Sequence, residues 1–246
     1  MQVAILTDIH SNLPALEAVL EAISAAGIKQ TWCLGDVVGY GAQPDECAAL
    51  VASECELSLV GNHDLAVLGE IDTDVFSAAA AAAVTWTQSN CKRETIDFLR
   101  GLKPEDTGHE VALYHASPRD PVWEYVLSVD QAAECMAEQA ERVSLIGHSH
   151  VALFFTDGDT GGSKNHTGGQ AEGGRVLDVT KGRWLINPGS VGQPRDGDRR
   201  AAWLELDTDE WKATFHRVDY EIDRAAEAIR AAGLPELLAD RLYAGQ

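Results

Sequence analysis

The sequence predicts an α/β fold in which helices alternate with the strands of a sheet. Residues 3–6 are a short, mostly β-favouring apolar run that ends at a polar pair, as a buried strand does. An amphipathic helix follows and ends at Gly27, and residues 30–34 read as a second strand. This strand–helix–strand order repeats further on, and the ends of the strands carry polar residues. A second half richer in strands completes the α/β pattern.

The first helix has clear start signals. Ser11 or Asn12 can cap it, and Pro14 lies where a first helical turn tolerates proline. Its apolar stripe has the spacing of one buried helix face and consists of Leu16, Val19, Leu20 and Ile23.

The repeat comprises a helix over residues 44–54, a strand over 56–60 and a turn at 61–64. Ligands of open α/β sheets collect outside the carboxyl ends of the strands. The polar residues at three consecutive strand ends are therefore expected on one face of the sheet.

Helices are also expected over residues 74–88, an alanine-rich stretch, and over 92–101. The C-terminus returns to helix over 222–232, with a shorter stretch after Pro235. Residues 157–174, rich in Gly, Thr and Asp, read as a mobile hairpin tip or loop. The remaining strands are expected at 111–115, 143–146, 151–156, 184–187, 201–206 and 212–218.

Net charge is the unusual feature of the composition. The chain has 39 acidic and 19 basic residues, a net charge of −20 at pH 7. Such a surface repels nucleic-acid phosphates and anionic membranes, so general nucleic-acid or membrane binding is not expected. The five cysteines form no CxxC pair, no stretch is long enough to span a bilayer, and the N-terminus lacks a signal-peptide pattern. A cytoplasmic location is the default expectation.

Five clusters could carry chemistry: Asp8-Ile9-His10, Gly35-Asp36, Gly61-Asn62-His63-Asp64, His115 and Gly147-His148-Ser149-His150. The i, i+2 spacing places two side chains on one side of an extended segment. Each cluster alone is a weak signal, but five of the eight histidines fall in the set and each cluster follows a predicted strand. The other three histidines, His109, His166 and His216, are assigned no chemistry.

Taken in order, these motifs resemble the signature of the calcineurin-like metallophosphoesterase superfamily: D-x-H, G-D-x-x, G-N-H-[DE], a lone His and G-H-x-H. The match runs from residue 3 to 150, and residues 39–41, 187–195 and 234–235 resemble its small bacterial single-domain branch. The resemblance implies a four-layer α/β/β/α sandwich, with two mixed sheets flanked by helices. Residues 1–246 would form one domain, with 222–246 as an appendage.

The resemblance also implies two divalent metal ions. One would be held by Asp8, His10, Asp36 and His150, and the other by Asp36, Asn62, His115 and His148. Two cations about 3.5–4 Å apart need a shared carboxylate, here Asp36, and turn a bridging water into hydroxide near neutral pH. Imidazole and oxygen ligands together suit Mn, Fe or Zn.

The implied reaction is in-line attack of the metal-bridging hydroxide on phosphorus. His63 would protonate the leaving oxygen as general acid, and Asp64 would orient His63. Arg195 would bind a phosphate oxygen, although a solvated loop arginine is an equal interpretation. Trp123 and Tyr125 would stack on a base or aryl group, or simply pack, which is the favoured interpretation.

The substrate is less constrained than the chemistry. The Ser/Thr protein phosphatases have G-D-x-x-D-R-G where this chain has Gly39 and Tyr40, which favours a small phosphodiester or phosphomonoester, including nucleotides, over a phosphoprotein. A dinucleoside polyphosphate hydrolase, a protein phosphatase and a non-catalytic binding scaffold are the alternatives. Apolar residues on the C-terminal helices would suit a homodimer.

Overall fold

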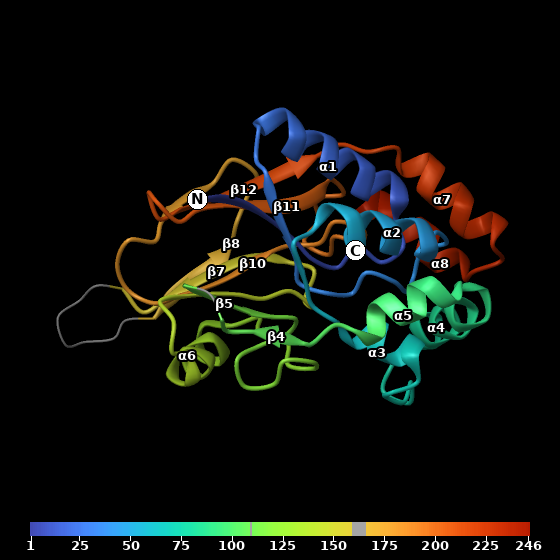
Figure 1. Ribbon diagram of the computed structural model, residues 1–246, viewed down its shortest axis with the longest axis horizontal. Coiled ribbons are helices and arrows are strands. Elements are labelled where there is room, and N and C mark those ends of the chain that lie inside the picture. The colour runs from blue at the N-terminus through green and yellow to red at the C-terminus, as the bar shows by residue number, and fades with distance from the viewer. Residues whose placement is uncertain (109, 159–165) are drawn as a thin grey trace.

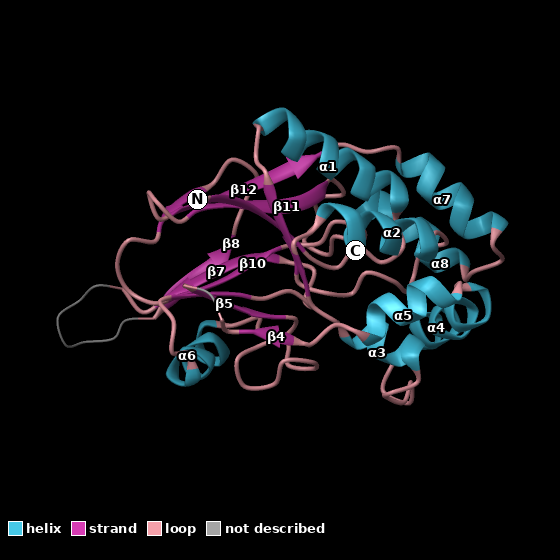
Figure 2. Ribbon diagram, viewed as in Figure 1, coloured by secondary structure: helices cyan, strands magenta, loops and turns pink. Residues whose placement is uncertain are grey.

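Two stacked six-stranded sheets organise the protein (Figures 1 and 2). The computed structural model describes residues 1–108, 110–158 and 166–246. The first sheet consists of β1 (Gln2–Leu6), β2 (Gln30–Cys33), β3 (Leu57–Ser58), β9 (Val176–Asp178), β11 (Ala201–Asp207) and β12 (Lys212–Val218). The second consists of β4 (Glu105–Asp106), β5 (Val111–Tyr114), β6 (Val143–Leu145), β7 (Ala152–Thr156), β8 (Thr167–Gln170) and β10 (Trp184–Pro188).

Both sheets are mixed, and each has a parallel part. The strand orders are β3-β2-β1-β11-β12-β9 and β4-β5-β6-β10-β7-β8. Strands β1, β2 and β3 run parallel in the first sheet, and β5, β6 and β10 run parallel in the second. The carboxyl ends of parallel strands lie at one edge of a sheet, so each sheet offers one such edge for a site.

Helices cover the outer faces of both sheets, which confirms the predicted four-layer sandwich. The helices are α1 (Leu13–Ala26), α2 (Pro44–Glu54), α3 (Asn62–Leu68), α4 (Ala78–Asn90), α5 (Arg93–Arg100), α6 (Val129–Glu138), α7 (Ile222–Ala231) and α8 (Glu236–Ala244). Figure 1 shows α1 and α2 over the first sheet and α6 against the second. Within the described residues, no helix is long and apolar enough to cross a bilayer.

Three apolar layers hold the sandwich together. Side chains such as Ile5, Leu113 and Ile186 fill the space between the sheets. Leu16 and Val19 of α1 pack on the outer face of the first sheet, while Met136 of α6 packs on the second. These side chains are almost completely buried, and burying each one stabilises the fold by about 1.5–3 kcal/mol.

The first strand–helix–strand unit forms as predicted. The Asn12 side chain caps α1 by accepting a hydrogen bond from the Ala15 N–H (3.2 Å), and Pro14 lies in the first turn. Gly27 ends the helix in the left-handed conformation, with φ 77°. Only Ser11 separates the cap residue from the Asp8–His10 segment, so the start of α1 helps to fix the position of that segment.

Several elements differ from the sequence-based expectation. Residues 61–64, expected as a turn, begin helix α3, and the strand expected at 56–60 is only Leu57–Ser58. Helix α6 and strands β4, β8 and β9 were not expected. Within the expected loop 157–174, Thr167–Gln170 form β8 and pair with β7, while 159–165 lie outside the described residues, as does His109.

The C-terminal helices pack onto the body of the protein beside α1 and α4. Ile229 of α7 and Leu242 of α8 share one buried apolar cluster with Ala83 of α4 and with Tyr40. Figure 1 shows α7 and α8 at the same end of the molecule as α3, α4 and α5. This packing places α8 close to the strand ends where the polar clusters lie.

Candidate metal centre and catalytic site

The predicted ligands come together at the carboxyl ends of the parallel strands of both sheets. Asp8 and His10 follow β1, and Asp36 follows β2. His115 directly follows β5, and His148 and His150 follow β6. All of these side chains are at least 97% buried, so the sandwich shields them from bulk water.

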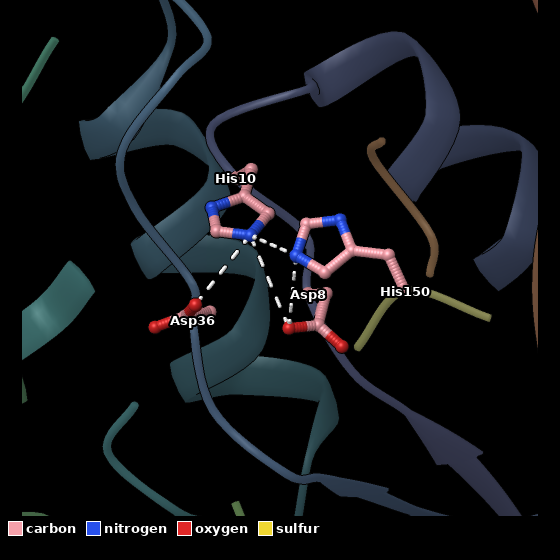
Figure 3. Close-up of side chains that lie close together, drawn as sticks. All are labelled: Asp8, His10, Asp36 and His150. Carbon is pink, nitrogen blue, oxygen red and sulfur yellow. Dashed lines mark hydrogen bonds and ion pairs between the residues drawn. The ribbon is translucent and has the colours of Figure 1, made fainter. Parts of the chain in front are cut away.

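Asp8, His10, Asp36 and His150 form the first ligand cluster, in which one ligand atom of each lies within 4.8 Å of the others. Figure 3 shows the four side chains converging from separate segments. His10 Nε2 lies 3.0 Å from His150 Nε2 and 3.5 Å from Asp36 Oδ2. His150 Nε2 lies 3.4 Å from Asp8 Oδ1.

The hydrogen bonds of the two histidines identify their tautomers. His10 Nδ1 lies 3.1 Å from the Val38 carbonyl oxygen, and His150 Nδ1 lies 2.7 Å from that of Gln193. A carbonyl only accepts, so each Nδ1 carries the proton and each Nε2 presents a lone pair. Two lone pairs then face each other at 3.0 Å, an arrangement that a shared cation would stabilise.

A second cluster joins Asp36 to His115 and His148. His115 Nδ1 donates to the Leu34 carbonyl (2.8 Å), and its Nε2 lies 3.6 Å from Asp36 Oδ2 and 3.3 Å from Asn62 Oδ1. His148 Nε2 is buried and has no hydrogen-bond partner among the described residues. A buried acceptor without a partner is costly, so a cation here would satisfy both histidines.

Asp36 belongs to both clusters and is held firmly. Its Oδ1 accepts the main-chain N–H of His63 at 2.8 Å, which leaves Oδ2 facing His10 and His115. Asp8 is held by the Thr7 hydroxyl (2.9 Å) and the main-chain N–H of His148 (3.0 Å). Both carboxylates are therefore oriented before any cation binds.

Burial shifts the protonation of these groups toward their neutral forms. It raises the pKa of Asp8 from 3.8 to about 7, and it raises the pKa of Asp36 well above the ordinary value. Burial also lowers the pKa values of His10, His148 and His150. Neutral imidazoles are the form that binds metal, whereas the carboxylates must lose protons to do so.

Backbone strain is concentrated at the same place. Residues other than glycine with φ between 50° and 64° include Asp8, His10, Asp36, His148 and His150. Aspartate and histidine tolerate this left-handed region better than most residues, but it still costs of order 1–3 kcal/mol at each position. Strain of this kind is typical of functional sites, and here it turns side chains of both sheets toward one point.

His63 lies beside the first cluster, at the start of α3. Its ring is 4.8 Å from that of His10 and 4.3 Å from that of Tyr40, and its buried Nδ1 has no hydrogen-bond partner in the part of the chain that the structure describes. Gly39, with φ 93°, makes room for it, because a Cβ there would lie 2.6 Å from His63 Nδ1. Burial lowers the pKa of His63, with a further contribution from Arg195.

Within the described residues, no hydrogen bond joins the Asp64 carboxylate to His63 Nδ1, and a direct orienting role of Asp64 stays a prediction. Its carboxylate accepts main-chain N–H groups of Val37 (3.2 Å), Val38 (3.0 Å) and Gly61 (3.0 Å). These bonds tie the segment after Asp36 to the first turn of α3. Asp64 therefore positions His63 indirectly, through the backbone.

Comparison with known proteins identifies the family. The model of the calcineurin-like phosphoesterase superfamily domain matches residues 1–209. The chain belongs to the calcineurin-like phosphoesterase superfamily. It is a hydrolase that acts on phosphoester bonds, and the family is metal-dependent. The expected restriction to a small bacterial branch remains a prediction.

Several similar proteins support this membership. A metallophosphoesterase of Sphaerobacter thermophilus has a structure with a TM-score of 0.88 and 40% identity, covering 100% of this chain and 99% of its own. An uncharacterized protein of Methanocaldococcus jannaschii is 41% identical over 99% of this chain and 98% of its own length. Phosphodiesterase YfcE of Escherichia coli is 30% identical over 41% of this chain and 57% of its own length.

A cavity of about 650 Å³ opens beside the ligand clusters of this phosphoesterase. Asn62 and His63 line one part of it, together with Tyr40 and Arg195. Arg195 is half-buried, and its Nη2 donates to Tyr40 Oη (3.2 Å) and to Gln193 Oε1 (2.9 Å). The guanidinium thus belongs to the site and is not a freely solvated loop arginine.

Trp123 and Tyr125 both pack and line the cavity. Tyr125 stacks on His148 with ring centroids 4.1 Å apart and is 44% exposed, while Trp123 meets Phe76 edge-to-face at 5.6 Å. These contacts support the favoured packing interpretation, and stacking on a base or aryl group stays a prediction.

Much of the other cavity wall is formed by residues that no sequence motif identifies. Phe76 and Ser77 precede α4, and Leu237 and Arg241 lie on α8, yet all four line the cavity. Motif spacing could not identify them because they reach the site only through the packing of α4 and α8.

Proposed function

We propose that the protein is a binuclear metal-dependent phosphoesterase that hydrolyses small phosphodiesters or phosphomonoesters, including nucleotides. One observation carries the proposal: two buried ligand clusters share Asp36 beside a cavity that also contains His63 and Arg195. A neutral or apolar ligand would gain nothing from this combination of imidazoles, carboxylates and a guanidinium.

The donor set fits divalent Mn, Fe or Zn. The first cluster offers two imidazoles and two carboxylates, and the second offers two imidazoles and the shared carboxylate, a combination that disfavours calcium and monovalent copper. A pair of such ions lowers the pKa of water and neutralises charge on phosphoryl oxygens. The metal ligands would be Asp8, His10, Asp36 and His150 for one ion, and Asp36, Asn62, His115 and His148 for the other.

The remaining residues act on the substrate. Arg195 binds an oxygen of the phosphoryl group and brings positive charge into a protein whose net charge is −20. His63 protonates the leaving oxygen. Its lowered pKa keeps the ring neutral in the free protein, and the negative charge of an entering ester opposes that shift. Asp64 holds the backbone that carries His63.

The test uses two aryl esters. Purified protein supplied with Mn²⁺ is expected to hydrolyse bis(4-nitrophenyl) phosphate or 4-nitrophenyl phosphate, followed as release of 4-nitrophenolate. Prolonged dialysis against EDTA should abolish turnover and added Mn²⁺ should restore it, because both clusters need their cations. If the metal-loaded protein hydrolyses neither ester but binds a protein tightly, the scaffold alternative is correct.

The affinity for Mn²⁺ is expected to fall at least tenfold for each pH unit below about 7. Asp8, with its pKa raised to about 7, holds a proton below that pH, and a cation must displace it. The raised pKa of Asp36 adds to the effect. Titration calorimetry at pH 6, 7 and 8 measures the affinity, and buffers of different ionisation enthalpy count the protons released. An affinity that is constant across these pH values would contradict the assignment.

A further inference from the structure

A second arginine lines the cavity, on a segment that the family model does not match. Arg241 lies on α8, and the matched residues end at 209. Its guanidinium carbon lies 6.0 Å from the centre of the Tyr40 ring, and that of Arg195 lies 5.5 Å from the same ring. Two cations therefore share one aromatic ring inside a single cavity.

Neither guanidinium has an aspartate or glutamate partner among the described residues. No side-chain carboxylate there forms an ion pair with Arg195 or Arg241. Arg241 Nε donates to an oxygen of Gln246, the last residue of the sequence (2.5 Å), and no hydrogen bond of its two Nη nitrogens is found in the described part of the chain. Two Nη groups with free donors, beside a second arginine in the same cavity, point to an anionic ligand.

The two arginines serve different parts of the cavity. Arg195 lies beside the first ligand cluster, since its main-chain N–H donates to the His150 carbonyl oxygen (3.0 Å). Arg241 enters the cavity from α8, next to Leu237 and Gln246. Among the described residues, no hydrogen bond or ion pair joins Arg241 to a proposed metal ligand, so its guanidinium is placed to bind a different part of the ligand from Arg195.

The wall of the cavity provides a place for an organic group. Phe76 and Trp123 line it, and Leu237 of α8, which is 61% exposed, adds apolar surface. An aromatic group packed here would have the metal centre at one end and Arg241 available for another charge. A cavity of about 650 Å³ is large enough for a nucleotide-sized molecule.

We propose that Arg241 binds a second anionic group of the substrate, so that the protein selects esters of aromatic organic groups that carry a second phosphate. The inference rests on the proposed function for the reacting phosphate, but the binding role of Arg241 stands on its own geometry. The guanidinium can form paired hydrogen bonds with phosphate oxygens.

The experiment measures binding and turnover separately. EDTA-treated protein is titrated calorimetrically with adenosine 5′-monophosphate, adenosine diphosphate and adenosine 3′,5′-bisphosphate, so that the second phosphate is tested at two positions. The wild type is expected to bind at least one doubly phosphorylated ligand about 10–100-fold more tightly than the monophosphate, as one added charge-assisted contact implies. Arg241→Gln should remove that advantage, and Arg241→Lys should keep part of it.

Arg224→Gln is the matched control, because Arg224 lies on the neighbouring helix α7 and pairs with Glu17 and Glu221 outside the cavity. It should bind all three nucleotides as the wild type does. Thermal melting establishes whether each variant is folded. In Mn²⁺-loaded protein, Arg241→Gln should lower kcat/KM more for the doubly phosphorylated ligand than for 4-nitrophenyl phosphate.

Two results would overturn the inference: no preference for either doubly phosphorylated ligand in the wild type, or an equal loss of affinity for all three ligands in Arg241→Gln. If the preference is present but the metal-loaded protein hydrolyses no ester, the proposed function fails while the binding role of Arg241 stands. The two claims can thus be rejected independently.

Discussion

Replacing Asp36 by asparagine is expected to reduce hydrolysis of either aryl ester by about a thousandfold, the size of effect that several kcal/mol of lost charge stabilisation produces. Asp36 Oδ2 lies 3.5 Å from His10 Nε2 and 3.6 Å from His115 Nε2, so one carboxylate serves both clusters. Asparagine preserves the shape but removes the charge. Metal analysis should show that Asp36→Asn retains less Mn than the wild type.

A stability measurement separates this role from a structural one. Burial raises the pKa of Asp36 in the folded protein, so ionising this carboxylate at high pH opposes folding when no cation is present. EDTA-treated Asp36→Asn should therefore melt at or above the wild-type temperature at pH 8. Asp45→Asn is the control, since Asp45 accepts the Thr95 hydroxyl (2.6 Å) away from the site. Normal metal content with normal turnover in Asp36→Asn would exclude the shared-ligand role.

Replacing His63 by alanine is expected to lower kcat by about a hundredfold to ten-thousandfold, the range for loss of a general acid. His63 is not assigned as a metal ligand, so the metal content should not change. The loss should be larger for an alkyl phosphate ester than for a 4-nitrophenyl ester, because 4-nitrophenolate leaves readily without a proton. The ratio of the two losses is therefore the diagnostic quantity.

His216→Gln is the matched control for this substitution. His216 stacks on Trp203 at 4.0 Å and lies 3.3 Å from Glu205, outside the cavity. The His216→Gln variant should hydrolyse both esters at the wild-type rate. If the kcat of His63→Ala falls by the same factor for both esters, His63 does not donate the proton and acts on packing or metal geometry instead.

The proposed metal ligands at the ends of β1 and β2 could be predicted from sequence because each one follows a short local pattern. Asp8 and Asp36 each follow a short apolar strand, and parallel strands bring such ends to one edge of a sheet. The order of the motifs then linked this edge to His115 and His148. The joining of two sheets around Asp36 came from the family resemblance, since no pattern within one strand encodes it.

The parts that were not predicted depend on contacts between distant residues. The Gly61–Asp64 segment has the composition of a turn, but Asp64 caps the first turn of α3 and binds the Asp36 loop, which makes the segment helical. The same bonds direct the Asp64 carboxylate oxygens to main-chain N–H groups. Arg241 joins the cavity through the packing of α8 on α4, a long-range contact without a sequence motif.

The proposed metal ligands are divided between the two sheets, so the proposed metal centre depends on distant parts of the chain. Asp8, His10 and Asp36 come from the N-terminal part, whereas His115 and His150 come from the C-terminal part, and each cluster needs members of both. A cut anywhere between Asp36 and His115 would leave neither fragment with a complete cluster. Recovery of metal binding on mixing two such fragments would therefore report their reassembly directly, in the manner of a split-protein sensor.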